Sequence, residues 1–449
     1  MRRATERSVL PGARIMPVVL VAVALIATSV LGTANGGVVN PTIRFATFNA
    51  CLYRSAAGGL CTDLLAGDAQ ARVIAEIVQR VRPDVLLINE FDYDPNGQAA
   101  TVFEKNYLNV GQNGQSPMHY SYIYAAPVNC GVPSGRDLNN NETIGDPGDS
   151  VGFGLFEGQY GMVLYSIYPI QYTAVRTFRT FLWKDMTNPQ LPTYPGSSKP
   201  WYTDAELAIL PLSTTGHWDV PILFGEMLIH VLCSHPTPPV FDGDEDANGH
   251  RNYDEIGFWA DYIDPAASGY IYDDTLVTGG LAPGAHFVIM GDLNADPNDG
   301  DARPGAAKQL TEHPLINSSS APASEGAAEQ AQLQGGANAT HVGDPKYDTA
   351  DWADVPADES CGNLRADYVL PSSAFGIADS SVFWPKSTDP LFSLVGAISP
   401  VPSSCTGACC PSPSSDHRLV WVDVFVPLLL PSYWRAAKMA DWIHIEFIP

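Results

Sequence analysis

The chain has 449 residues, of which 45% are hydrophobic, enough for one large domain or two ordinary ones with a substantial core. It carries 49 Asp and Glu against 24 Lys and Arg, a formal net charge of −25. Such a surface repels polyanions at long range, which argues against a protein that grips nucleic acid through a broad basic face. A metal site could still recruit a phosphate group locally.

The N-terminus is typical of a secretory signal. Four arginines precede an apolar run over residues 16–31, and Gly32-Thr33-Ala34 supplies the small residues expected at a cleavage site. A transmembrane anchor is the alternative, but the run is shorter than the roughly 20 apolar residues that a spanning helix needs. We therefore predict a signal peptide over residues 1–34, a secreted protein, and no stable membrane insertion after the signal is removed.

Eight cysteines fit an exported, oxidised protein. A Cys51–Cys61 disulfide would close a short loop, and Cys361 could reach the cluster Cys405, Cys409 and Cys410. That cluster could instead bind a metal, but no second pair of closely spaced cysteines supports a zinc site. The connectivity cannot be read from the sequence.

The first predicted elements are a strand, a helix and a second strand. Residues 42–48 alternate as a strand that ends at Asn49. Apolar residues recur at helical spacing over residues 68–80, with Pro83 as a stop. Residues 84–89 then form a buried strand that ends in Glu90. This order indicates an α/β layer.

Long loops separate the later strands. Residues 106–159 and 184–204 are predicted as surface loops from their turn-forming residues, and residues 298–362 carry few signals of order. Further strands are expected over residues 160–166, 224–233, 287–290, 364–371 and 418–426.

Asp292 and Asn294 follow the apolar strand 287–290 and Gly291. We expect Gly291 to let the backbone turn at the end of the strand, where a side chain would crowd it. Because Asp292 and Asn294 are two residues apart, their side chains point to one face if the extended conformation persists. A carboxylate and an amide on one face can hold a water, a metal or a phosphate oxygen. The alternative is that the two residues only cap a turn.

The same pattern recurs along the chain: a predicted apolar strand borders a polar residue of a type that is common in catalytic sites. It occurs at Asn49, Glu90, His235, Asp292 with Asn294, Asp367, and Asp416 with His417. Any one of these residues alone is more often structural. Ligand sites in layered α/β folds lie where strand ends converge, so we predict that these residues form one site.

These residues lie in a series of short motifs. In chain order the motifs are Thr47-Phe48-Asn49, Asn89-Glu90, Ser234-His235-Pro236, Gly291-Asp292-Leu293-Asn294, Asp367-Tyr368-Val369 and Ser415-Asp416-His417. The series resembles the endonuclease/exonuclease/phosphatase superfamily over roughly residues 42–426, and most resembles its secreted bacterial members. The resemblance implies an α/β protein, a four-layer α/β/β/α sandwich of two mixed β-sheets with outer helices. It also implies a catalytic domain over residues 35–427, followed by a tail of unknown role over residues 428–449.

The resemblance further implies a metal-dependent hydrolase of phosphoesters. Glu90 is expected to be the principal metal carboxylate, with Asn49 and Asp416 beside it. Hard oxygen ligands favour Mg²⁺ or Mn²⁺.

The remaining motif residues are expected to carry the chemistry. The resemblance implies that Asp292 positions and deprotonates the attacking water and that Asn294 helps to hold the phosphate. It also implies that His417, oriented by Asp367, stabilises charge on the phosphate. His235 is expected to serve the leaving group. In-line attack on phosphorus independently requires an activated water and donors for the developing charge.

The substrate is less constrained than the reaction. Ile167 stands where many members of the superfamily have an arginine, Cys51 stands where several have a polar group, and no Lys/Arg-rich run follows the signal. We expect small or terminal phosphoesters to be better substrates than duplex DNA. The alternatives are an extracellular nuclease acting on DNA or RNA, and a non-catalytic, Ca²⁺-stabilised surface protein with the same fold. The sequence implies no protein partner.

An acidic stretch after His235 matches the calcium loop of an EF-hand. Its oxygen ligands would come from Asp244, Asp246, Asn248 and Glu255. Three prolines in residues 236–239 argue against an entering helix, whereas residues 255–262 could form the exiting one. The alternative is a solvated acidic loop at the rim of the active site.

Overall fold

The computed structural model describes residues 41–352, 361–396 and 412–426. The predicted signal peptide, Cys405, Cys409, Cys410 and the tail 428–449 lie outside the described residues. The contacts divide the chain into Met1–Pro41 and a second unit that begins at Thr42. In the part of the chain that the structure describes, none of the helices has the length and apolar character needed to cross a membrane.

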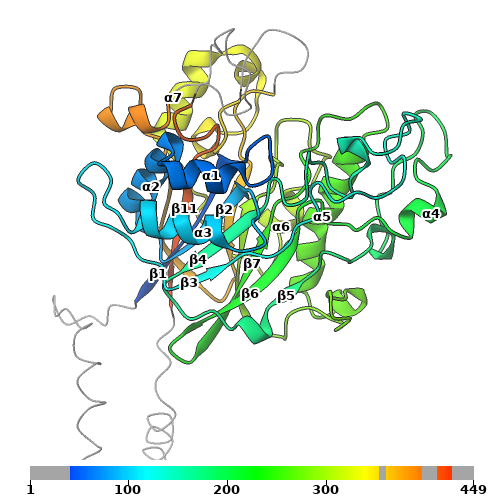
Figure 1. The fold of residues 1–449 in the computed structure, drawn as a ribbon, viewed down its shortest axis with the longest axis horizontal. Coiled ribbons are helices and arrows are strands. Elements are labelled where there is room, and N and C mark those ends of the chain that lie inside the picture. Colours follow the sequence, from blue (N-terminus) through cyan, green and yellow to red (C-terminus); the bar gives the residue numbers. More distant parts are fainter. Residues whose placement is uncertain (1–40, 353–360, 397–411, 427–449) are drawn as a thin grey trace, which may run out of the picture. The chain divides into compact units, whose positions relative to one another are not determined.

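Two mixed β-sheets form the centre of the second unit (Figure 1). The first sheet has six strands in the order β10-β11-β1-β2-β4-β3, and only β1 and β2 pair in parallel. Its strands are β1 (Thr42–Leu52), β2 (Val85–Phe91), β3 (Tyr122–Tyr124), β4 (Met162–Ser166), β10 (Gly376–Val382) and β11 (Val420–Phe425).

The second sheet has five strands in the order β5-β6-β7-β8-β9, and only β7 and β8 pair in parallel. Its strands are β5 (Arg176–Thr177), β6 (His217–Phe224), β7 (Met227–Ser234), β8 (His286–Asp292) and β9 (Asp367–Pro371).

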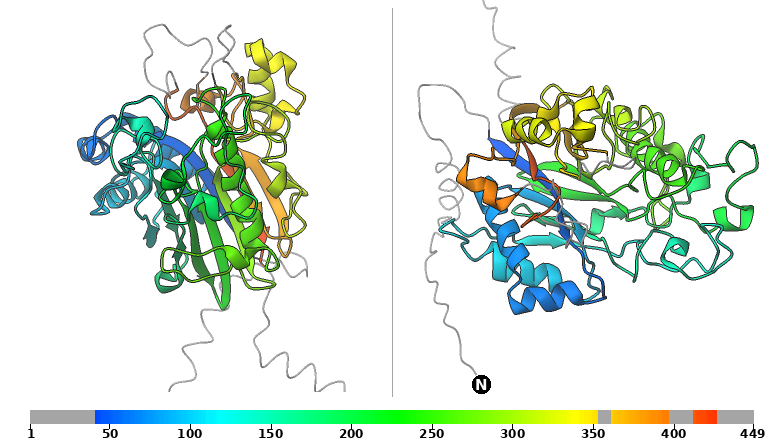
Figure 2. Two further views of the ribbon diagram at one scale, coloured as in Figure 1. Left: turned by 90° about the vertical axis from the view of Figure 1, so that its right-hand side faces the viewer. Right: turned by 90° about the horizontal axis from the view of Figure 1, so that it is seen from above.

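The sheets pack face to face, with helices on their outer faces (Figure 2). Along β8, Val288 and Met290 pack in the core cluster that includes the first sheet, whereas Phe287 and Ile289 pack with helix α5 (Ala247–Ile263). This alternation is what a strand buried on both faces requires. The predicted four-layer α/β/β/α sandwich is therefore confirmed.

Three helices cover the outer face of the first sheet: α1 (Gly59–Ala66), α2 (Ala69–Val81) and α3 (Gln98–Phe103). Helix α2 is the helix predicted over residues 68–80. It begins where Asp68 accepts a hydrogen bond from the backbone N–H of Ala71 at 2.7 Å, and it ends before Arg82, whose φ is 55°. The remaining helices are short: α4 (Asp204–Leu207), α6 (Lys308–Thr311) and α7 (Glu325–Gln334).

The hairpin of β6 and β7 was only half predicted, because the expected strand over residues 224–233 is β7 alone. Pro221 in β6 is a poor sequence signal for a strand. It is tolerated because β5 pairs only with residues 218 and 219 of β6. The carbonyl of Pro221 accepts the N–H of Gln171, so the missing N–H lies on the side of β6 that faces away from β7.

The predicted Cys51–Cys61 disulfide is wrong. Cys61 lies in the first turn of α1 and carries a free thiol. The predicted pairing of Cys361 with the Cys405–Cys410 cluster involves residues outside those that the structure describes.

Candidate active site

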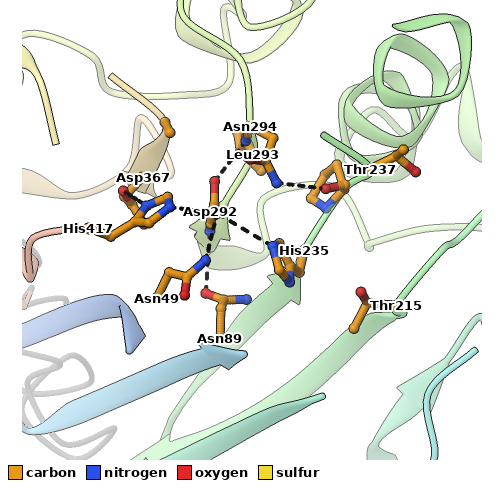
Figure 3. A network of polar contacts seen from close by, with 12 residues as sticks. Asn49, Asn89, Thr215, His235, Thr237, Asp292, Leu293, Asn294, Asp367 and His417 are labelled. Carbon is orange, nitrogen blue, oxygen red and sulfur yellow. Dashed lines mark hydrogen bonds and ion pairs between the residues drawn. The ribbon is translucent and has the colours of Figure 1, made fainter. Parts of the chain in front are cut away.

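The strand ends of both sheets converge on one group of polar side chains (Figure 3). The first sheet contributes Asn49 from β1 and Glu90 from β2, and the second contributes Asp292 from β8 and Asp367 from β9. His235 directly follows β7. The structure thus brings together residues that the sequence analysis placed in one site.

Asp292 lies at the centre of this group and is buried. Its Oδ2 accepts a hydrogen bond from Asn49 Nδ2 at 3.0 Å, and it faces His235 Nε2 at 3.4 Å and His417 Nε2 at 3.7 Å. Its Oδ1 accepts the backbone N–H of Asn294 at 2.8 Å. Donors from both sheets therefore surround a single carboxylate.

The charges in this group stabilise one another. Burial alone would raise the pKa of Asp292, but His417 and His235 lower it below the ordinary value for an aspartate. Burial alone would lower the pKa of both histidines, but the carboxylates facing them raise it above the ordinary value. The arrangement favours an ionised Asp292 between two protonated imidazoles.

His417 is oriented by Asp367. The Nδ1 of His417 lies 2.8 Å from Asp367 Oδ2, which also accepts the hydroxyl of Thr349 at 2.7 Å. The Trp352 ring meets the imidazole edge-on, with ring centroids 5.4 Å apart. A carboxylate at Nδ1 fixes the ring so that Nε2 points towards Asp292.

Glu90 forms the other side of the group. Its backbone φ is 56°, a strained conformation for a residue with a side chain, which the surrounding structure must maintain. Burial raises the pKa of Glu90 to about 7, against the opposing effects of His235 and the Asn49 amide. Asp416 raises it further, and burial also raises the pKa of Asp416 itself.

These donors fit a hard divalent cation. Glu90 and Asp416 are two carboxylates that repel one another in a partly buried place, and the Asn49 side-chain amide lies beside Glu90. A bound cation would remove that repulsion. Asp292, Asp367 and His417 also place ligand atoms within 4.8 Å of one another. Because Asp367 and His417 are already hydrogen-bonded to each other, we favour Glu90 and Asp416 as the metal side.

Gly291 allows the close approach of β7 and β8. Its φ is 151°, and a Cβ at this position would lie 2.1 Å from the carbonyl oxygen of Ser234. Any side chain would therefore push β8 away from β7 and displace Asp292 relative to His235. The prediction that a side chain would crowd the backbone at this strand end is therefore confirmed.

The comparisons identify the family of the chain. The model of the Endonuclease/Exonuclease/phosphatase family matches residues 47–417. The chain belongs to this family. The resemblance seen in the motifs is thereby confirmed, and family membership supports a metal-dependent hydrolase. No curated protein matches the chain.

Three solved structures that are similar to the chain share low sequence identity with it. An endonuclease/exonuclease/phosphatase from Beutenbergia cavernae is 15% identical, with a TM-score of 0.45 over 86% of this chain and 72% of its own. Sphingomyelinase C from Streptomyces griseocarneus is 14% identical, with a TM-score of 0.42 over 85% of this chain and 99% of its own. A mutant beta toxin from Staphylococcus aureus, with bound magnesium ions, is 12% identical, with a TM-score of 0.40 over the same shares.

Asn89 ties the active site of this family member to both sheets, and the sequence analysis gave it no role. Its Oδ1 accepts the Thr47 hydroxyl and the backbone N–H of Asp292, each at 3.3 Å. Its Nδ2 donates to the carbonyl of Ser234 at 3.2 Å. The available signal was an asparagine at the end of an otherwise apolar strand, directly before Glu90, where a buried amide needs partners from a neighbouring element.

The predicted calcium loop is not formed. Helix α5 begins at Ala247, so the fifth and twelfth loop positions, Asn248 and Glu255, lie on a helix. Glu255 is buried, and its two oxygens accept the backbone N–H groups of Thr214 and Thr237 at 2.7 and 2.6 Å. It therefore supports the loop after His235 instead of binding a cation.

The other two predicted ligands do not converge with Glu255. Asp246 pairs with Arg303 at 2.6 Å, and Asp244 is exposed. Among the described residues, these carboxylates do not form a group whose oxygens could surround one ion. The calcium-loop pattern specifies only the spacing of the ligand residues. It does not specify where the following helix begins, so it matched a stretch in which the helix begins too early.

Thr349 was also missed, and it gives a testable prediction. Its hydroxyl donates to Asp367 and accepts the backbone N–H groups of Ala366 and Asp367 at 3.0 and 2.9 Å. Thr349→Val should lower kcat by about tenfold, because a hydrogen bond to a charged group is worth about 1.5–3 kcal/mol. The pKa of His417, followed by NMR, should shift in the same variant.

Thr349→Ser is the matched control, because it keeps the hydroxyl and should restore both kcat and the pKa of His417. Equal activity of Thr349→Val and the wild-type protein would show that Asp367 does not depend on this residue.

Proposed function

We propose that this hydrolase is a phosphoesterase in which Asp292 accepts the proton of the attacking water. The position of Asp292 carries this proposal, because a buried, ionised carboxylate lies within 3.4 and 3.7 Å of two imidazole nitrogens. A base beside two proton donors suits a reaction in which water is deprotonated while negative charge develops on the substrate.

The two histidines then have different tasks. His417 is held by Asp367, so its Nε2–H has a fixed direction and can donate to the oxygens of the phosphoryl group. His235 approaches Asp292 from β7, and we assign it the protonation of the leaving group. Asn294 donates its Nδ2 to the carbonyl of Pro236 at 3.0 Å, which ties the Asp292 loop to the loop carrying His235.

We assign the metal to Glu90, Asn49 and Asp416. The preferred ion is Mg²⁺ or Mn²⁺, because carboxylate and amide oxygens are hard ligands. When bound, such an ion polarises a phosphoryl oxygen and stabilises the charge that develops on it. The raised pKa of Glu90, about 7, reflects the burial that this ion would compensate.

We propose small or terminal phosphoesters as the substrate class. Among the described residues, several arginines already form ion pairs with carboxylates: Arg44, Arg54, Arg80, Arg176, Arg303 and Arg418. Ile167 after β4 is exposed and apolar. A protein that binds duplex DNA usually neutralises several phosphates with lysine and arginine, so these observations favour a small substrate.

The test compares kcat/KM for a small phosphodiester, a phosphomonoester and duplex DNA in one buffer with Mg²⁺. A small ester should be hydrolysed with the highest kcat/KM, and chelation with EDTA should abolish the activity. If duplex DNA has by far the highest value, the protein is a nuclease. If the folded, metal-loaded protein hydrolyses no phosphoester of any class, the non-catalytic alternative is favoured.

We also propose that the protein is secreted after removal of residues 1–34, which leaves a catalytic domain over residues 35–427. The support is the arginine-rich start, the apolar run and the small residues at 32–34. Mass spectrometry of the exported protein should find a mature N-terminus near residue 35. An intact N-terminus in the exported protein would contradict this.

A further inference from the structure

A buried ion pair lies directly behind His417. The Nη2 of Arg418 donates to Asp351 Oδ2 at 2.8 Å, and neither side chain is exposed to solvent. The Nη1 of the same guanidinium donates to the backbone carbonyls of Ser415 and His417, at 2.8 and 3.1 Å. One side chain thus holds the backbone on both sides of Asp416.

The Asp351 carboxylate is fixed from a second direction. Its Oδ1 accepts the side-chain amide of Gln334, the last residue of α7, at 2.6 Å. The Oε1 of Gln334 in turn accepts Asn363 Nδ2 at 2.8 Å. Because both oxygens of the carboxylate have donors, Asp351 presents Arg418 with an acceptor of fixed orientation.

The ion pair also joins the two chain segments that support His417. The backbone N–H of Arg418 donates to the carbonyl of Thr349 at 2.7 Å, and the backbone N–H of Asp351 donates to the carbonyl of Asp416 at 2.8 Å. The hydroxyl of Thr349 donates to the carboxylate that orients the imidazole. The ion pair therefore lies where displacement of either segment would move His417.

Stability alone is a weak explanation for this ion pair. Taking two charges out of water is costly, and apolar side chains of similar volume often stabilise a protein as well or better. Among the described residues, the buried Nε of Arg418 has no hydrogen-bond partner, although the guanidinium carbon lies 4.4 Å from the centroid of the Trp384 ring. What a guanidinium provides, and an apolar cluster does not, is a set of donors in fixed directions.

We propose that the Asp351–Arg418 ion pair positions His417 for the reaction. By fixing the backbone that carries the imidazole, it keeps Nδ1 against Asp367 and Nε2 towards Asp292. Neither partner of the ion pair contacts the substrate. The inference rests on the proposed function, because His417 acts on a phosphoryl group only there. A small displacement of the imidazole should therefore lower turnover while substrate binding changes little.

The test replaces both partners in the full chain, with Asp351→Leu and Arg418→Met together. This double variant leaves no uncompensated buried charge, so it should remain folded by circular dichroism and thermal unfolding. With a small phosphodiester, kcat should fall by about a hundredfold while KM changes little. The low-field proton signal of His417 Nδ1–H, recorded by NMR without substrate, should shift or disappear because its hydrogen bond to Asp367 is perturbed.

A second ion pair provides the matched control. Arg44 donates to Asp423 through Nε and Nη2, both at 2.7 Å, and its guanidinium also lies over a tryptophan ring, that of Trp421. This pair joins the start of β1 to β11, away from Asn49. Arg44→Met with Asp423→Leu should therefore leave both kcat and the His417 signal unchanged.

Gln334→Leu tests the same ion pair with a smaller change, because it removes one hydrogen bond to Asp351 and leaves both charges paired. It should lower kcat a few-fold and broaden the His417 signal.

The proposal is overturned if the folded double variant keeps either the wild-type kcat or the wild-type signal of His417, or if the control loses as much turnover. If the double variant does not fold, wild-type behaviour of Gln334→Leu overturns it. If the wild-type protein hydrolyses no phosphoester but the His417 signal responds as expected, the proposed function fails and the positioning of His417 stands.

Discussion

Replacing Asp292 with asparagine is expected to lower kcat by about a thousandfold while the protein remains folded. The amide has the same shape as the carboxylate, but it cannot accept a proton from water at neutral pH. It also removes the negative charge that His235 and His417 face at 3.4 and 3.7 Å. Steady-state kinetics with a small phosphodiester, together with circular dichroism, measure the two parts of this expectation.

The histidines provide a second measurement that does not depend on activity. Asp292 raises the pKa of His235 against the effect of burial, so His235 should titrate at lower pH in Asp292→Asn than in the wild-type protein. The pKa of His417 should fall less, because Asp367 remains at its Nδ1. An unchanged pKa of His235 by NMR would mean that Asp292 is not ionised beside it.

Glu90→Gln is expected to lower activity by orders of magnitude and to weaken Mg²⁺ binding, with little change in melting temperature. The glutamine keeps the size of the side chain but loses the charge that attracts a hard cation. Because burial already raises the pKa of Glu90 to about 7, removing its charge should not destabilise the metal-free protein. Magnesium titrations of activity, and of melting temperature, measure the loss.

Glu76→Gln is a suitable control for this prediction. Glu76 is also buried, but it lies on α2 and pairs with Arg80, away from the strand ends. Its substitution should leave the Mg²⁺ dependence of activity unchanged. Near-normal turnover of Glu90→Gln at saturating Mg²⁺ would refute the metal assignment.

The convergence of the site could be predicted from the sequence for a simple physical reason, whereas the four layers were implied by the resemblance to the superfamily. Apolar strands that end in a polar residue must place that residue at the end of a sheet, and the ends of neighbouring strands lie together. Glu90 and Asp292 do lie at the ends of β2 and β8, whereas β1 continues past Asn49 to Leu52 and Asp367 is the first residue of β9.

The contributions of Asn89 and Thr349 could not be read in this way. Each acts through hydrogen bonds to residues that are remote in the sequence, and a single polar residue carries no signal of such partners. Strand β6 was not predicted because a proline within a strand is tolerated only where the neighbouring strand does not reach it, and the extent of β5 cannot be read from the sequence. The calcium loop was predicted wrongly because spacing alone does not show which way the helical side chain of Glu255 points.

Because the site is divided between the two sheets, activity depends on how closely the two sheets pack against each other. Asn49 and Glu90 are fixed to the first sheet, whereas Asp292 and Asp367 are fixed to the second, and Asn89 forms a hydrogen-bonded bridge between them. A separation of the sheets by little more than the width of a water molecule would break these contacts while every strand kept its neighbours. The protein should therefore lose function in mild denaturant before it loses secondary structure, and substitutions in the apolar layer between the sheets should impair turnover from a distance.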